Sequence, residues 1–214
     1  MSNITHNVWR FLDENPCIRE VIKLDLVNTS ALARHLIVNN KIEGSLDAVI
    51  IAIRRYELDK HDEIYSTAKK LFKKTINIST KSNLAEISLV KDTEVQKILP
   101  QLFEFIHYVQ GDVLRVTQAN KSIRLLMDEK HFEKVKDIFP KEKILAEEKD
   151  LGEINIFIYP EMQNTPGILA VMTNELSISG VNIREFMTCP PEMICVVKKD
   201  DLIKAYNVLY NLSK

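Results

Sequence analysis

Residues 163–186 read QNTPGILAVMTNELSISGVNIREF, an apolar segment between two turn-forming sites. Thr165 is a typical residue before a helix, and Pro166 suits the first helical position, where its missing N–H donor costs nothing. Gly180 can adopt the left-handed backbone that ends many helices, because it has no Cβ. The stretch therefore predicts a helix that turns directly into a strand.

The same order of elements occurs twice after about residue 75. Glu86-Ile87-Ser88-Leu89 aligns with 153–156 at a shift of 67, and Gly111 to Arg115 aligns with 180–184 at a shift of 69. Near-constant shifts indicate two copies of one unit. Each copy reads strand, helix, strand, strand, helix, which is the split βαβ order. The second copy either lacks its last strand or borrows one.

The predicted elements of the two copies share an apolar periodicity of two for strands and three to four for helices. In the first copy, the strands are 84–90, 113–118 and 123–128, the helices are 93–110 and 132–139, and 143–147 is a candidate fourth strand. In the second copy, the strands are 154–159, 182–188 and 193–198, and the helices are 166–179 and 202–212. On the first long helix, we expect Phe103, Phe105, Ile106 and Val109 to face the core, with Pro100 kinking or starting it.

The preceding part of the chain, up to about Lys74, has a helical pattern throughout. Its start signals are Pro16 at a first helical position, Thr29 or Ser30, Ser45 and Asp62. A short strand over 75–79 and a turn at Lys81, Ser82 and Asn83 are expected to follow. We predict an α+β fold with an N-terminal helical bundle over 1–74 and two ferredoxin-like βαββαβ modules over 75–148 and 149–214.

Composition restricts the classes of partner. The 29 basic and 30 acidic residues leave a net charge of −1, so nothing global argues for nucleic acid or a membrane. No secretion signal and no apolar run of the roughly 20 residues that span a bilayer are present, so we expect a cytoplasmic protein with no membrane partner. The odd number of cysteines, Cys17, Cys189 and Cys195, favours reduced thiols, and Cys195 is expected in the core rather than as a nucleophile.

Within the quoted stretch, residues 164–169 followed by Leu176 and 180–183, and then the strand 192–197, resemble the ACT-domain family. This resemblance implies small βαββαβ modules that regulate amino-acid metabolism by binding amino acids. The pattern is most similar to the tandem regulatory half of aspartokinases. It covers roughly residues 84–212 and is strongest in the second copy.

The resemblance implies an effector site in the second copy, with a strand residue that usually faces the loop across an interface between modules. Its residues would be Gln163, Asn164, Thr165, Pro166, Gly167, Ile168, Leu169 and Asn182. Gly167 leaves the first backbone amides of the helix uncovered, and these attract a carboxylate. The alternative is that Pro166 and Gly167 only start a helix. In the first copy there is no Pro-Gly pair, and Asp92 and Glu94 would repel a carboxylate.

Catalysis is not expected. The N-terminal part is too short for an aspartokinase catalytic half and contains no glycine-rich phosphate loop. The five histidines are scattered without metal-ligand spacing, so neither a metal nor a cofactor is predicted. An enzyme remains the third hypothesis, because ACT-bearing chains often accompany catalytic domains.

Two N-terminal segments, 28–36 and 45–56, resemble the paired helices of helix-turn-helix proteins, which would present Arg54 and Arg55 to DNA. Against this, residues 1–74 hold 12 basic and 10 acidic residues, and both arginines fall at the C-terminal end of their helix. A protein-docking bundle is the alternative.

Together, these features predict a regulator that senses a small amino acid and signals to DNA. The alternative is a regulatory subunit, or regulator in trans, of an aspartokinase-type biosynthetic enzyme. Because such modules pair at their sheet edges, we expect a homodimer through the ACT modules.

Overall fold

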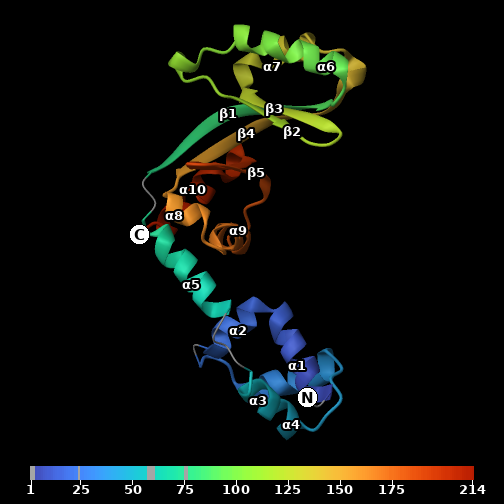
Figure 1. The fold of residues 1–214 in the computed structure, drawn as a ribbon, viewed down its shortest axis with the longest axis vertical. Helices are drawn as coiled ribbons and strands as arrows, with labels where there is room; N and C mark the ends of the chain where they lie inside the picture. Colours follow the sequence, from blue (N-terminus) through green and yellow to red (C-terminus); the bar gives the residue numbers. More distant parts are fainter. Residues whose placement is uncertain (1–2, 24, 57–60, 75–76) are drawn as a thin grey trace. The chain divides into compact units, whose positions relative to one another are not determined.

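The computed structural model describes residues 3–23, 25–56, 61–74 and 77–214. Its contacts divide the chain into two compact units, residues 1–67 and 68–214. The first unit is helical, and the second contains the sheet (Figure 1). Each unit is described by itself below.

The helical unit is built around one apolar core. Its helices are α1 (Asn3–Glu14), α2 (Pro16–Lys23), α3 (Thr29–Asn39) and α4 (Leu46–Arg54), and α5 (His61–Phe72) follows. The core holds Val8, Leu12, Ala33, Leu36, Ile42, Val49, Ala52 and Ile53. Trp9 packs against this core, and its indole Nε1 donates to the Ala52 carbonyl at 3.0 Å.

The start signals of these helices are partly confirmed. Pro16 is the first residue of α2, and the Ser45 hydroxyl accepts from the Ala48 amide at the start of α4. The expectation for α3 was wrong by one residue, because Asn28 is the N-cap and accepts from the Ala31 amide. The side chain of Asp62 lies outside the described part of the chain.

The second unit contains a six-stranded antiparallel sheet in the order β2-β3-β1-β4-β6-β5. Its strands are β1 (Asn77–Val90), β2 (Leu114–Gln118), β3 (Ser122–Asp128), β4 (Ile144–Phe157), β5 (Ile183–Cys189) and β6 (Glu192–Lys198). Its helices are α6 (Thr93–Ile98), α7 (Phe132–Asp137), α8 (Pro160–Gln163), α9 (Ile168–Ile178) and α10 (Leu202–Leu212). The predicted α+β class, with helices first and interleaved strands and helices after, is confirmed.

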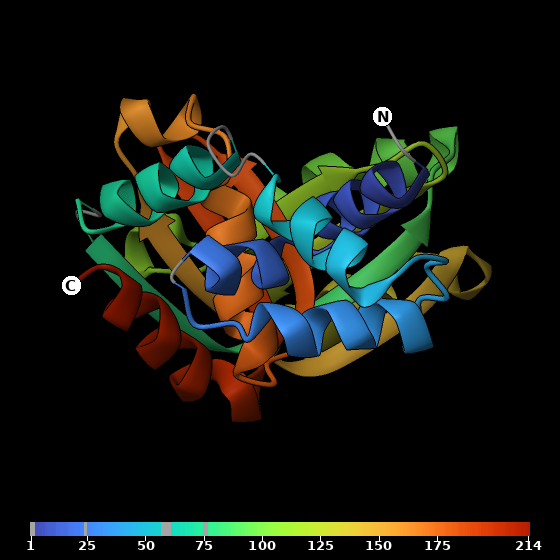
Figure 2. The same cartoon turned by 90° about the horizontal axis from the view of Figure 1, so that it is seen from below.

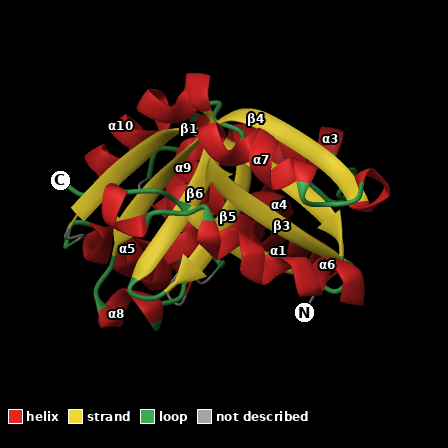
Figure 3. Cartoon of the chain, turned by 90° about the horizontal axis from the view of Figure 1, so that it is seen from above, coloured by secondary structure: helices red, strands yellow, loops and turns green. Residues whose placement is uncertain are grey.

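The two longest strands, β1 and β4, each serve both copies of the repeat and curve across the sheet in Figure 3. Residues 77–81 of β1 pair with 153–157 of β4, whereas Ser88 pairs with Ala146 at the other end. The second copy therefore borrows its outer strand from the segment that precedes the first copy. The predicted boundary at 148/149 falls inside β4.

The turn predicted at residues 81–83 was wrong, because β1 continues through it as a bulge. The pairing with β4 shifts register between Lys81 and Leu84, and Asn83 has a φ of 57°. Asp150, 67 residues later in β4, has a φ of 56°. Asn and Asp tolerate this left-handed backbone better than most residues. Both copies therefore bend their long strand at equivalent positions.

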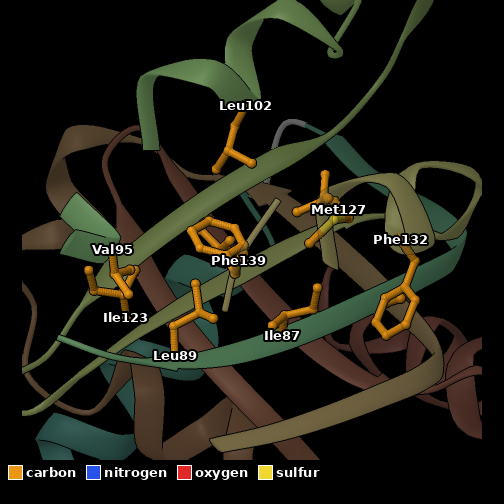
Figure 4. Packing of buried hydrophobic residues seen from close by; sticks show 11 residues of the cluster. Ile87, Leu89, Val95, Leu102, Ile123, Met127, Phe132 and Phe139 are labelled. Atoms are coloured by element: carbon orange, nitrogen blue, oxygen red, sulfur yellow. The ribbon is translucent and has the colours of Figure 1, made fainter. Parts of the chain in front are cut away.

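Helices cover the outer faces of the bent sheet. In Figure 1, α6 and α7 lie beyond one half and α8 to α10 beyond the other, and α10 packs against β1, β4 and β6 (Figure 2). The core under α6 and α7 joins residues of β1 and β3 to Val95, Leu102, Phe132 and Phe139 (Figure 4).

A second apolar cluster lies on the opposite face of the strands, where the two halves of the sheet meet. It contains Leu84, Leu126, Leu151, Ile194 and Val196, with Val113 and Met187 packed against it. The Thr117 hydroxyl of β2 approaches the Met187 sulfur of β5 at 3.6 Å. The two edge strands are therefore close, because the sheet folds back over this cluster.

The long helix predicted over 93–110 was wrong in extent. Only α6 is α-helical, and a 3-10 segment over Leu99–Glu104 follows, with Pro100 near its start. Proline lacks the N–H that would continue the helix. Ile106 is buried as expected, but Phe103 and Val109 are exposed.

Candidate functional site

The α9 helix begins with backbone amides that no side chain caps. Gly167 is the N-cap, with φ 91° and ψ −11°, in the left-handed region. The Val171 amide bonds to the Gly167 carbonyl at 2.9 Å, which leaves the amides of 168–170 as the open first turn. Thr165 was wrongly expected as the N-cap, because its hydroxyl donates to the Glu161 carbonyl of α8 at 2.8 Å.

A mostly apolar cavity of about 330 Å³ adjoins this helix start. Its lining comes from four elements: Ile158, Met162, Gln163, Thr165, Pro166, Gly167, Ile168, Leu169, Thr188, Pro190 and Met193. Six of the eight residues predicted for the effector site are among them. The cavity is thus adjacent to open amides, a combination that suits a small molecule with one anionic and one apolar end.

Asn164 and Asn182 are not among the lining residues. The Asn164 side-chain amide donates to the Pro160 carbonyl at 3.4 Å. Asn182 follows the far end of α9, where Gly180 has a φ of 70° and the Val181 amide bonds to the Leu176 carbonyl. This confirms Gly180 as the helix terminator. It also means that a single module does not bring Asn182 to its own loop.

The equivalent corner of the first copy is closed by its own side chains. The Asp92 carboxylate caps α6 by accepting from the Val95 amide at 2.9 Å. Lys143 forms ion pairs with Asp92 and Glu94. The hydrogen bond from Lys143 and the bond from the Val95 amide lower the pKa of Asp92. A ligand carboxylate would therefore meet an anion at this corner rather than open amides.

Sequence reasoning missed the residues that close the cavity from outside the loop, namely Ile158, Met162, Thr188, Pro190 and Met193. Ile158 follows β4, Met162 lies on α8 just before the loop, and the other three lie on β5, β6 and the turn between them. The register of β5 and β6 brings these last three to the loop. The one signal available was the apolar run of β6, in which Met193 is the first of five consecutive buried residues.

The remaining candidate chemistry is limited. Among the described residues, no group of three or more potential ligands is arranged to hold a metal. Cys195 is buried as expected, and burial raises the pKa of its thiol to about 12, so the thiolate nucleophile is disfavoured at neutral pH. Cys17 and Cys189 are exposed.

Arg54 and Arg55 lie exposed at the C-terminal end of α4. The Arg55 amide donates to the Ile51 carbonyl as part of the C-cap, while Asp47 occupies the first turn. Helix-turn-helix proteins contact bases mainly from the N-terminal end of the second helix. The arginine pair thus lies at the C-terminal end of α4, which contacts DNA less often in such proteins. The Asp47 carboxylate lies at the N-terminal end.

Comparison of the sequence with protein-family profiles and with curated proteins gives no match. Comparison of the structure finds the regulatory subunit of aspartate kinase from Thermus flavus, with a TM-score of 0.54 and 12% identity over 65% of this chain and 99% of that one. The second unit has the fold of the regulatory ACT pair of aspartate kinases.

Two further structures extend this similarity of fold. The ligand-free regulatory subunit of aspartate kinase from Thermus thermophilus has a TM-score of 0.53 and 13% identity, over 65% of this chain and 98% of that one. Clostridium acetobutylicum aspartate kinase has a TM-score of 0.53 and 21% identity over 65% of this chain. The chain spans only 35% of the length of that enzyme.

In the part of the chain that the structure describes, none of the helices is both long enough and apolar enough to cross a membrane.

Proposed function

We propose that this chain is a non-catalytic regulator that binds a small amino acid at the start of α9. The observation that carries the proposal is the uncapped first turn next to a cavity of about 330 Å³. The similarity of fold to regulatory subunits of aspartate kinase supports a regulatory role for the second unit.

In this proposal, the effector carboxylate accepts hydrogen bonds from the amides of residues 168–170, at the positive end of the helix. Gln163 and Thr165, which line the cavity, bond to its ammonium group. The effector side chain extends toward Met162 and Met193, which are buried. The apolar lining favours a short aliphatic side chain over a charged one.

Asn182 enters the site from a second copy of the chain, in a homodimer paired through the ACT modules. Both β2 and β5 are edge strands, and unpaired backbone groups at a sheet edge favour such pairing. Sedimentation equilibrium tests this step: a monomer at micromolar concentration, with and without effector, would contradict it.

Thermal shift of the full chain against the twenty amino acids and the products of the aspartate family tests effector binding. A ligand at 100 times its dissociation constant adds about 2.7 kcal/mol to stability. We expect one or a few aliphatic amino acids to raise Tm in a concentration-dependent way. If none of them shifts Tm at millimolar concentration, the proposal fails.

The first output partner to test is DNA, bound through α3 and α4. Retention on a DNA column that weakens with salt, and that is lost in the Arg54→Ala/Arg55→Ala double variant, would support it. Arg10→Ala removes one exposed positive charge from α1 of the same unit and serves as the control. Equal retention of the double variant and the wild type would contradict DNA binding through these arginines.

A second candidate is regulation in trans of an aspartokinase-type enzyme, with the helical unit as the docking module. The observation that favours it is that the two Thermus regulatory subunits are covered over 98% and 99% of their length, so the pair occurs there as a separate chain. Recovery of a kinase with the tagged full chain, reduced by the effector or dependent on it, would support this candidate.

A further inference from the structure

The interior between the two halves of the sheet contains a closely bonded Arg–Glu pair at one end. The Arg115 guanidinium of β2 donates from Nε and Nη2 to the two carboxylate oxygens of Glu153, at 2.9 and 2.8 Å. The Glu153 side chain is only 5% exposed. This two-pronged bond from one half to the other neutralises a buried carboxylate.

The repeat predicts the same pair at the other end of the interface, but a β-bulge removes it. In the first copy, Arg115 pairs in register with Leu126 of β3. In the second copy, the residue that pairs with the equivalent Val196 is Glu185, because the register shifts between Ile183 and Glu185. Arg184 is the extra residue of this bulge.

Arg184 is directed elsewhere as a result. Its Nη2 donates to the Glu148 carboxylate at 2.6 Å. Glu86, which the repeat makes equivalent to Glu153, is only 8% exposed. Glu86 accepts a hydrogen bond from the Ser88 hydroxyl at 3.3 Å and forms a long ion pair with Arg124 Nε at 3.7 Å. The buried Glu86 carboxylate thus has one weak contact with a cation, whereas Glu153 accepts two hydrogen bonds from Arg115.

The electrostatics at this end are correspondingly unfavourable to a second anion. Burial, and then the negative charge of Glu86, raise the pKa of Glu185, and Arg124 only partly opposes this. Glu86 and Glu185 therefore share the Arg124 guanidinium, which is 3.7 Å from Glu86. At the other end Arg115, although it also lies near Glu192, makes two direct hydrogen bonds to Glu153.

A cavity of about 610 Å³ lies beside Glu86. Its lining includes four acidic and four basic residues: Glu86, Glu147, Glu148, Asp150, Arg124, Lys149, Arg184 and Lys198, together with Ser88 and Ala146. Most of the outer charges are already in ion pairs: Glu148 with Arg184 and Lys198, Glu147 with Lys136, and Lys149 with Glu133. The volume suits a small molecule, and the buried polar group at the inner end would fix its orientation.

We propose that this cavity binds a small amino acid whose side chain carries a guanidinium or ammonium group. The cationic group occupies on Glu86 the place that the Arg115 guanidinium occupies on Glu153. A carboxylate at the other end of the ligand meets Lys198 and Arg184, where it competes with Glu148 for these two cations. The ligand thereby completes the interface that the bulge leaves incomplete. This site is separate from the loop at Gly167 and does not depend on the proposed function.

Isothermal titration of the full chain with L-arginine and L-lysine, and with L-citrulline as the neutral isostere of arginine, tests the cation requirement. At least one of the two cationic compounds should bind. If that compound is arginine, citrulline should bind at least about tenfold more weakly than arginine. Absence of binding by both cations up to about 10 mM, or equal binding of citrulline and arginine, would overturn the proposal.

Two variants locate the site. Glu86→Gln should weaken binding of the cation about ten- to a hundredfold, because it removes a charge-assisted bond. Glu192→Gln removes a carboxylate that is bonded to Asn155 at the opposite end, and it serves as the matched control. Glu185→Arg supplies an internal guanidinium at the position equivalent to Arg115, and it should abolish binding while raising Tm by about 2–4 °C. Wild-type affinity in both Glu86→Gln and Glu185→Arg would overturn the proposal.

Gly167→Ala separates this site from the proposed effector loop. Cation binding at Glu86 should be the same in Gly167→Ala as in the wild type. Loss of cation binding in Gly167→Ala with retention in Glu86→Gln would place the ligand at the loop and overturn the inference.

Discussion

Three glycines of the second unit adopt the same left-handed backbone conformation but have different structural roles. Gly111 and Gly180, with φ of 81° and 70°, each precede the second strand of their copy, at aligned positions. Gly167, with φ of 91°, has no counterpart in the first copy, where Asp92 begins the helix instead. The conformation of this one residue distinguishes an open helix start from a closed one.

Gly167→Ala should therefore lower stability and remove the response to the proposed effector. A Cβ in the left-handed region costs about 1–2 kcal/mol, and relief of that strain would displace the open amides. Gly111→Ala is the matched control, because it has the same strain and no atom near its Cβ position. Both variants should lower Tm similarly, but only Gly167→Ala should lose the effector-induced shift. A full shift in Gly167→Ala would show that these amides are not the binding group.

At this scale, the sequence allowed the prediction of Gly180 as terminator and of Cys195 as a core residue. The role of Thr165 was not predictable in the same way. Its hydroxyl can cap a following helix or bond back to a preceding turn, and α8 supplies the carbonyl of Glu161 for the second choice. Only the backbone of Gly167 decides between them.

The long strands are the elements in which local pattern and three-dimensional pairing differ most. Lys81, Ser82 and Asn83 have the composition of a turn, yet β1 crosses them without reversing. The short strands β2, β3 and β6 were predicted closely, because each is a short apolar-rich run between turn-forming or charged residues. The helix over 93–110 was not, because Pro100 changes the turn geometry. Continuity through a bulge depends on pairing with β4, which no local window contains.

Asn83 forms the bulge of β1 in a left-handed backbone conformation, with a φ of 57°. Asn83→Ala should destabilise the second unit by about 1 kcal/mol, because alanine lacks the polar side chain that makes the left-handed region accessible. Ser82→Ala, one residue earlier, should have little effect. Urea denaturation of both variants measures the difference, and equal midpoints would contradict a special role for position 83.

At the scale of the whole second unit, the two halves of the sheet are held by an apolar cluster and by the Arg115–Glu153 pair. Arg115→Ala leaves a carboxylate that is 5% exposed without its partner, which costs about 3 kcal/mol. Arg184→Ala removes the aligned arginine, whose pair with Glu148 is more exposed, and should cost at most about 1 kcal/mol. Similar costs for both arginines in urea denaturation would contradict the asymmetry between the two ends.

Acid should destabilise the second unit through a group of ion-paired carboxylates. Bonds from Lys130, from the His107 amide and from His131 lower the pKa of Asp112 from its ordinary value of 3.8, and Lys143 does the same for Asp92. Their stabilisation is complete above that ordinary value and is lost as pH falls below it through the folded pKa. Glu185 acts in the opposite direction, because its pKa is raised.

We therefore expect Tm to fall as the pH drops below 3.8, the ordinary value of these aspartates. Asp112→Asn should lower Tm at neutral pH and reduce the acid dependence, and Glu129→Gln, a nearby helix-start residue, should leave that dependence unchanged. Thermal melts of the three proteins across the pH range make the comparison. An acid profile of Asp112→Asn that matches the wild type would exclude Asp112 as a main contributor.

The exchange of strands between the copies affects how the protein can be made. Residues 77–81 leave the ribosome early, but their neighbours at 153–157 are synthesised only after the whole first copy. A truncated product that stops at residue 148 would leave residues 77–81 without the strand that they pair with. Such an exposed edge is prone to aggregate. Expression of either copy alone should therefore fail where co-expression of the two fragments succeeds.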